Sequence, residues 1–122
     1  LYDGAANYPD IGVQWRFAKE AQINHFGNGS PLFIATMKQN IKDVNQIELS
    51  KLKTIGATGS PLSEDAFIWI QDKLPKTQII SLSGGTDVCS AFIGGCTMLP
   101  VYSGYLQCNI GNTSLVFIIQ LL

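Results

Sequence analysis

Hydrophobic and polar positions in the first two thirds of the chain predict helices that alternate with short strands. Residues 11–22 carry Val13, Phe17 and Ala21 about four positions apart, the spacing of one buried face of an amphipathic helix. Asp10 precedes this stretch and is the expected N-cap, because its carboxylate can accept a hydrogen bond from a free backbone N–H of the first turn. The first element is therefore expected to be a helix that buries the side with Val13 and Phe17.

Two further helices have clear start signals. Ser30 is the candidate cap of a helix that opens at Pro31, since proline suits the first helical turn. Ser63 is expected to cap a third helix, whose first turn carries acidic residues at the positive end of the helix dipole and which stops before Pro75. The inward-facing residues expected in these helices are Leu32, Ile34, Ala35 and Met37 in the second, and Phe67, Ile70 and Leu74 in the third.

Short apolar runs between the helices predict strands at residues 23–26, 52–57 and 78–82. Strands that are joined through helices by short connections pair in parallel, with right-handed crossovers. The predicted fold class is therefore α/β, with a parallel sheet and flanking helices in the order β-α-β-α-β. A short, mostly β C-terminal segment is expected to follow.

Charged residues are confined to one part of the chain. All 17 of them lie between Asp3 and Asp87, and residues 88–122 carry none. The length of 122 residues fits a single domain, in which we distinguish an α/β core at 1–87 from an uncharged, β-rich extension at 88–122. Because the net charge is only -1, no electrostatic binding surface for nucleic acid or for a membrane is expected.

Three cysteines, Cys89, Cys96 and Cys108, form an odd number at spacings that fit neither a disulfide framework nor a metal-binding pair. We expect half-buried, unreactive thiols in a reducing compartment, and hence a cytoplasmic location. The longest apolar run, 115–122, is too short for a membrane span of about 20 residues. The chain starts with Leu-Tyr-Asp, without an initiator Met or a leader, so this numbering is expected to begin inside a longer protein.

Glycine-bearing turns follow all three predicted strands, at residues 27–30, 58–61 and 83–87. Ligands bind at the carboxyl ends of the strands in parallel sheets, so these turns are a candidate binding site. Turn geometry alone produces the same composition, and neither glycine motif for phosphate binding is present. His25, the only histidine, falls on the first predicted strand, where a satisfied core imidazole is expected rather than a catalytic base. No nucleophile elbow is present either.

Four stretches of sequence make the chain resemble a known family. They are LYDG at the start, TIGATGSPLS in the middle, ISLSGGTDVCSAFIGG after it and LPVYSGYLQC near the end. In this order and spacing they are similar to the adenylate-forming acyl-CoA synthetases, over about residues 1–108, and SGGTD looks like the acetoacetate-specific branch. The resemblance implies an internal fragment of the large N-terminal domain of that fold.

The resemblance also implies a two-step ligase reaction with small-molecule substrates. Acetoacetate attacks the α-phosphorus of ATP to give an acyl-adenylate and diphosphate, and the thiol of coenzyme A (CoA) then displaces AMP. Thr86 would hydrogen-bond the α-phosphate, and Asp87 would take the place of the acid associated with Mg²⁺, so these two are the candidate catalytic residues. This chemistry relies on positioned donors and on a cation held by oxygen ligands, not on a protein nucleophile.

Two further groups of residues receive roles from the same resemblance. The adenine would lie between Gly59, Ser60 and Pro61 on one face and Ser83 and Gly84 on the other. The acyl pocket would be approached by Asn28, Gly29 and Gly85. The chain departs from the family at two points, because relatives commonly stack an aromatic residue where this chain has Ser83 and Gly84, and because Tyr105 replaces an acid after Gly104.

Several parts of the family's active site fall outside this segment. The phosphate loop lies upstream of it, and the ribose-binding Asp, the hinge and the C-terminal lysine lie downstream. A chain without them cannot align ATP with a carboxylate, so the isolated polypeptide is expected to be inactive and to bind none of ATP or AMP, Mg²⁺ and CoA. Agreement with the family ends after Cys108, through either a truncated or frame-shifted end or ordinary divergence.

Two alternatives to an inert fragment stay open. The chain could act as a non-catalytic module that binds adenine nucleotides. It could also be a structural module that self-associates through residues 115–119, because this stretch is uncharged, β-prone and free of proline, and an exposed edge strand there could pair with another chain. The alternative to self-association is that this strand packs against the core of its own chain and is not exposed.

Overall fold

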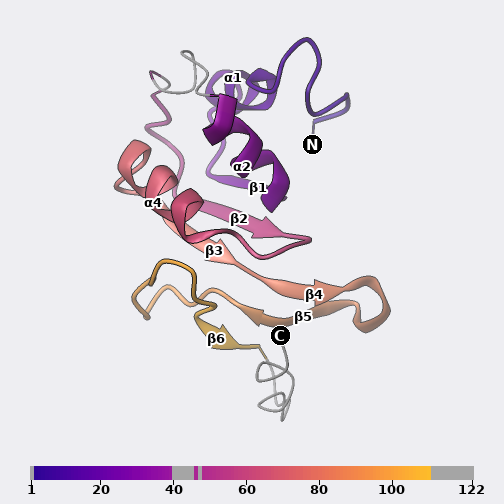
Figure 1. The fold of residues 1–122 in the computed structure, drawn as a ribbon, viewed down its shortest axis with the longest axis vertical. Coiled ribbons are helices and arrows are strands. Elements are labelled where there is room, and N and C mark those ends of the chain that lie inside the picture. The colour runs from indigo at the N-terminus through magenta and orange to yellow at the C-terminus, as the bar shows by residue number, and fades with distance from the viewer. Residues whose placement is uncertain (1, 40–45, 47, 111–122) are drawn as a thin grey trace.

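The computed structural model describes residues 2–39, 46 and 48–110, and in them helices and strands alternate much as the sequence predicts (Figure 1). The elements are, in chain order, α1 (Val13–Glu20), β1 (His25–Gly29), α2 (Ser30–Gln39), β2 (Thr54–Thr58), α4 (Glu64–Lys73), β3 (Gln78–Ser81), β4 (Ser83–Gly85), the 3₁₀ helix η1 (Thr86–Val88), β5 (Ser90–Gly94) and β6 (Cys108–Asn109). The strand expected at 115–119, and with it the expected route of self-association, lies outside the described residues.

The strands form two sheets with different pairing. In the first sheet the order is β1-β2-β3 and both pairs are parallel, with Gly29 opposite Thr58 and Ala57 opposite Ser81. The second sheet, β4-β5-β6, is antiparallel. In Figure 1 the three labelled helices gather around the first sheet, and the second sheet continues away from them beyond β3. The predicted fold class, a parallel α/β core followed by a small β segment, is confirmed.

The core lies between the helices and one face of the first sheet. Alternation along the strands places Phe26, Ile55 and Ile79 on that face, each at most 7% exposed. The helices contribute Trp15, Leu32, Phe33, Ala66, Phe67 and Ile70 to the same cluster. The third helix agrees with its prediction in detail, because Phe67, Ile70 and Leu74 are buried and the Ser63 Oγ accepts a hydrogen bond from the backbone N–H of Ala66 at 3.4 Å.

The first helix turns a different face inward from the predicted one. Its buried residues are Gln14, Trp15 and Ala18, whereas Phe17 is 37% exposed and Ala21 is exposed. Trp15 decides this rotation because its indole is packed edge-on against three other rings, those of Phe26, Phe33 and Trp69. Its Nε1–H also donates to Thr36 Oγ1 at 3.2 Å, so the polar end of the buried ring has a partner.

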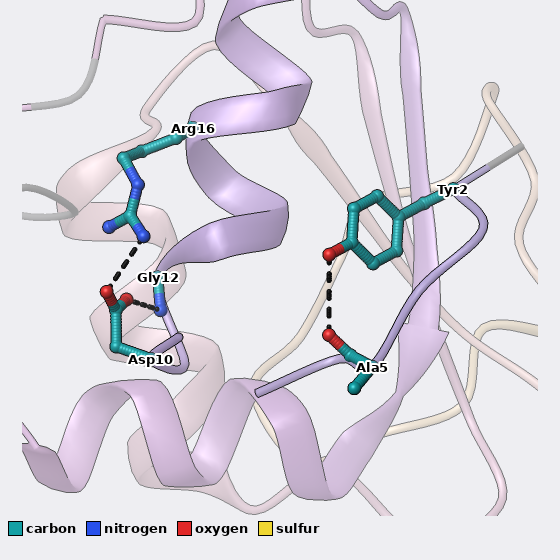
Figure 2. Close-up of polar contacts among 5 residues, drawn as sticks. All are labelled: Tyr2, Ala5, Asp10, Gly12 and Arg16. Atoms are coloured by element: carbon teal, nitrogen blue, oxygen red, sulfur yellow. Dashed lines mark hydrogen bonds and ion pairs between the residues drawn. The ribbon is translucent and has the colours of Figure 1, made fainter. Parts of the chain in front are cut away.

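The predicted N-cap of the first helix is also wrong. Gly12 occupies the cap position and makes no side-chain cap bond. Asp10 instead accepts a hydrogen bond from the Gly12 backbone N–H at 2.8 Å and forms an ion pair with Arg16, also at 2.8 Å (Figure 2). Its carboxylate therefore stabilises the loop that precedes the helix, from a position two residues before the N-cap.

The second helix begins at Ser30, so this residue lies inside the helix and does not cap it. The Ser30 side chain is fully buried, and its hydroxyl donates to the backbone carbonyl of Ser60 at 2.6 Å. Of the predicted inward positions Leu32 is buried, while Ile34, Ala35 and Met37 are half-buried. Phe33 and Thr36, both 0% exposed, face the core more directly.

His25 lies on a strand as predicted, but its side chain is exposed, so the expectation of a core imidazole is wrong. The ring lies over the two paired glycines Gly27 and Gly56, where an added Cβ would come within 3.1 Å of it. Its Nδ1 is 2.7 Å from Thr54 Oγ1. The physical reason is that the helices cover the opposite face of the sheet, the one that carries Phe26 and Ile55.

The thiols agree with their prediction only in part. Cys96 and Cys108 are half-buried, but Cys89 is exposed at the turn after η1, with a φ of 51°. All three are free cysteines. Within the described part of the chain, no helix has the length and hydropathy that crossing a membrane requires.

The Asp10 ion pair predicts a specific pH dependence of stability. The Arg16 guanidinium, and after it the Gly12 N–H, hold the pKa of the Asp10 carboxyl below its usual value. A lowered pKa in the folded state means that the contribution is present above the unfolded pKa of about 3.9 and is lost as the pH falls through the folded pKa. We expect the stability advantage of the native chain over an Asp10→Asn chain to shrink as the pH is lowered from about 6 to about 2.

The measurement is urea unfolding of both chains across that pH range. Asparagine keeps an oxygen that can accept from Gly12, and all other carboxyls titrate in both chains, so the difference isolates the charge of Asp10. A difference in unfolding free energy that stays constant with pH contradicts the assignment.

Candidate functional site

The turn predicted at residues 27–30 is wrong, because residues 27–29 belong to β1 and Ser30 already begins α2. This β1–α2 junction, which we call the first turn, lies beside the turn at 58–61, since Gly29 and Thr58 are the last paired residues of β1 and β2. The bond from the buried Ser30 hydroxyl to the Ser60 carbonyl joins the turns directly. Gly59, with a φ of +82°, supplies the left-handed conformation that this turn needs. The two turns therefore form one connected surface.

The third segment has a different structure from the predicted turn. β3 ends at Ser81, the backbone N–H of Leu82 donates to the carbonyl of Ala57 at 2.9 Å, and Ser83–Gly85 then forms β4 of the antiparallel sheet. Residues 83–87 are thus one arm and the tip of a β-hairpin, not a turn that leads into a helix. A run of serine and glycine fits both structures, which is why composition alone did not separate them.

The hairpin nevertheless extends from the same edge of the first sheet as the other two segments. Leu82 is hydrogen-bonded to Ala57 near the end of β2, and the next residue, Ser83, is the first of β4. Figure 1 shows β4 continuing in the direction of β3, so that η1 lies at the same end of the molecule as the carboxyl end of β2. In this view (Figure 1) the carboxyl end of β2 and the tip of the β4–β5 hairpin therefore lie on the same side of the molecule.

The candidate residues on these segments are open to solvent. Exposed positions include both adenine-side groups, the phosphate-side pair and one acyl-side residue, Gly85: Gly59, Ser60, Pro61, Ser83, Gly84, Gly85, Thr86 and Asp87. Two cavities lined by described residues, of about 230 and 200 Å³, lie elsewhere and contain none of these residues. The segments thus form an exposed wall that carries hydroxyl groups and is not enclosed.

Gly84 has a packing role that the sequence does not reveal. A Cβ at this position would lie 2.5 Å from the Ser90 carbonyl oxygen and 2.8 Å from the Ala91 Cα, both backbone atoms of β5. At Gly85, in contrast, no atom lies within 4 Å of an added Cβ, and the φ of -166° is ordinary extended backbone. Gly84 is therefore required for the close approach of β4 to β5, and Gly85 is not.

Among the residues that the structure describes, Asn28 is the one candidate whose side chain makes hydrogen bonds inside the fold. Its Nδ2 donates to Gln14 Oε1 at 2.5 Å, and its Oδ1 accepts from the backbone N–H of Gly29 at 2.8 Å. Gln14 was missed in the sequence because its helix was assigned the face with Val13 and Phe17. A glutamine beside Trp15, on the face that also carries Ala18, was the available signal.

The oxygen ligands at the hairpin tip are too few to bind a magnesium ion alone, but they suit an ion that substrate phosphates also bind. Asp87 supplies one exposed carboxylate, and Thr86 supplies a hydroxyl. No cluster of three or more His, Cys, Asp or Glu side chains suited to a metal occurs among the residues that the structure describes. Magnesium is commonly held by one or two carboxylates together with substrate phosphates, and this donor set matches that pattern.

Known proteins resemble the chain over most of its length. No family model matches it. It is 34% identical over 108 residues to the acetoacetyl-coenzyme A synthetase of Rhizobium meliloti (strain 1021), which covers 88% of this chain and 17% of the relative. It is 33% identical over 113 residues to the acetoacetyl-CoA synthetase of Gallus gallus, which covers 91% of this chain and 17% of the relative. The chain therefore spans about a sixth of the length of these relatives.

Solved structures give the same result in three dimensions. The acetoacetyl-CoA synthetase from Streptomyces lividans superposes with a TM-score of 0.81 at 37% identity, over 89% of this chain and 18% of that chain. The anthranilate CoA ligase AuaEII, in complex with anthranoyl-AMP, gives a TM-score of 0.74 at 20% identity, over 85% of this chain and 19% of that one, and supports the fold alone.

The fold is that of a part of the adenylate-forming enzymes on which the chain superposes. More particularly, the chain is homologous to a segment of the acetoacetyl-CoA synthetases, which confirms the resemblance seen in the sequence. The roles of individual residues stay predictions.

The two neighbouring glycines offer a matched test of the hairpin geometry. Gly84→Ala should destabilise the chain by about 1–3 kcal/mol, because the new methyl group overlaps the backbone of β5. Gly85→Ala should change the unfolding free energy by less than about 0.5 kcal/mol. Urea unfolding measures both values, and amide hydrogen exchange at Ala91 locates the effect. Equal costs for the two substitutions contradict the close approach.

Proposed function

We propose that this chain is one wall of the nucleotide and acyl site of an acetoacetyl-CoA synthetase-like ligase. In the intact enzyme the reaction joins acetoacetate to CoA, with ATP converted into AMP and diphosphate. The observation that carries the proposal is the common edge on which the Ser30–Ser60 bond and the β4 hairpin bring the three strand ends together. The homology to enzymes of that name supports the choice of reaction.

In this proposal the exposed turns bind the nucleotide. Gly59, Ser60 and Pro61 contact one face of the adenine, and Ser83 and Gly84 contact the other. Small residues on both sides let the backbone approach a flat ring closely, but they offer no aromatic stacking. Affinity for the base must therefore come from shape and backbone hydrogen bonds.

The hairpin tip faces the reacting phosphate. The hydroxyl of Thr86 would donate to an α-phosphate oxygen, and the Asp87 carboxylate would hold Mg²⁺ together with the phosphates. When bound, the ion would neutralise part of the phosphate charge. Asn28, Gly29 and Gly85 approach the acyl group. In an intact enzyme, loss of one such positioned donor costs on the order of 10²- to 10³-fold in rate.

The chain by itself presents this wall to water. Positioning of two reactants supplies a large part of the rate enhancement of such enzymes, and a wall that is open on its far side cannot hold ATP and a carboxylate in line. The same openness removes most contacts that would bind ATP, AMP or CoA, while the ordering cost of binding stays. The free, partly exposed thiols favour a reducing compartment, and we place the protein in the cytoplasm.

The isolated 122-residue chain should therefore show no ligase turnover. With ATP, Mg²⁺, acetoacetate and CoA, AMP release should equal that of a blank without protein, while the Streptomyces lividans synthetase serves as the positive control. CoA-dependent AMP release above the blank, abolished by Thr86→Ala, contradicts the expected inactivity.

A segment exchange tests whether the wall can work when the rest of the enzyme surrounds it. Residues 1–108 should replace the matching segment of the Streptomyces lividans synthetase with measurable activity retained. In that chimera Thr86→Ala should lower kcat/KM by about 10²- to 10³-fold. Thr97→Ala, at an exposed threonine of the same extension, is the matched control and should change it less than about twofold. Equal effects of the two substitutions contradict the role of Thr86.

A further inference from the structure

Gln14 is a buried amide in a helix that otherwise buries apolar side chains. It is 8% exposed, lies next to Trp15 in the first turn of α1, and contacts Asn28 at the end of β1. A buried amide without partners destabilises a fold, and an apolar residue of similar size would fill the same space. The side chain is therefore best explained by the bond that it makes.

The orientation of both amides follows from a single backbone group. The N–H of Gly29 can only donate, so the Asn28 atom that lies 2.8 Å from it must be the oxygen Oδ1. The nitrogen Nδ2 then faces Gln14, and the Gln14 atom that receives its hydrogen bond must be the oxygen Oε1. Gln14, Asn28 and Gly29 thus form a chain of two hydrogen bonds with one consistent direction.

We infer that Gln14 is a positioning residue that holds the Asn28 carboxamide in one orientation at the carboxyl end of β1. A primary amide has two N–H hydrogens and two acceptor lone pairs. One of each is used by Gln14 and Gly29, so Asn28 keeps one N–H and one lone pair for a ligand. Within residues 2–39, 46 and 48–110 the structure shows no further partner for either.

A fixed, unused N–H favours an acyl group that carries an oxygen. The ketone of a 3-oxo acid can accept this hydrogen bond, whereas a saturated acyl chain of the same length leaves the donor unpaired. The assignment of this selectivity to the acyl group rests on the proposed function. The positioning of Asn28 by Gln14 does not depend on it.

Nuclear magnetic resonance on the isotope-labelled chain tests the positioning. Gln14→Leu removes the acceptor at similar volume, and Gln71→Leu is the control, because Gln71 on α4 also makes an amide hydrogen bond, to the Pro75 carbonyl just after that helix. In Gln14→Leu the Asn28 Nδ2 proton signals should move towards those of a solvated amide, and hydrogen exchange of the Gly29 N–H should become about five- to tenfold faster. In Gln71→Leu both should stay unchanged. Unchanged signals in Gln14→Leu, or equal changes in the control, overturn the inference.

If Gln14→Leu does not fold, a second variant, Gln14→Glu, tests the same contact. Gln14→Glu retains an acceptor oxygen, and its ionisation strengthens a hydrogen bond from Asn28. The Asn28 Nδ2 protons should therefore shift as the introduced carboxyl titrates. Nδ2 signals that do not respond to this titration show that the two side chains are not in contact, and overturn the inference.

A ligand titration separates this inference from the proposed function. In the Streptomyces lividans chimera that carries residues 1–108, labelled at asparagine, acetoacetate should shift the free Asn28 Nδ2 proton, and butyrate, which lacks the ketone, should not. Equal shifts, or no shift with either acid, contradict the acyl assignment of Asn28 that the proposed function makes, while the two variants decide on Gln14 independently.

Discussion

Parallel pairing of three short strands is the constraint that determines where every candidate functional residue lies. Parallel strands that are joined through helices must all end at the same edge, so the turns after β1 and β2 and the start of β4 lie together whatever their sequence. The core reinforces this arrangement because the strand faces with Phe26, Ile55 and Ile79 pack against the helices. Residues at the edge do not have to fill the core, so small residues such as glycine, serine and threonine can occupy it without loss of core packing.

Three hydrogen bonds fix the helices relative to one another and to the strand ends at that edge. Trp15 donates to Thr36 and fixes α1 against α2, Gln14 holds Asn28 at the end of β1, and Ser30 holds the turn after β2 through the Ser60 carbonyl. Two of them join a buried side chain to a candidate ligand-binding segment. Such bonds contribute modestly to net stability, but leaving one member unpaired inside the fold is costly, so they favour one geometry over its neighbours.

Elements with a single apolar face could be predicted from the sequence, and elements with two competing faces could not. The helix at Glu64–Lys73 has one buried stripe and a serine cap, and both were predicted. Apolar residues lie on two sides of α1, and only the ring contacts of Trp15 select between them. The segments of the candidate site could likewise be predicted from their glycines and from family resemblance. The hairpin form of residues 83–87 and the bond to Gln14 depend on contacts between distant residues, which no local pattern contains.

The tight crossing at Gly84 has a consequence for how this lineage can change. Here the backbone of β5 occupies the volume that any side chain at position 84 would need. A single substitution therefore cannot place a larger residue at this position unless β5 moves as well. A larger contact surface on this strand would have to come from a neighbouring position, such as the exposed Ser83.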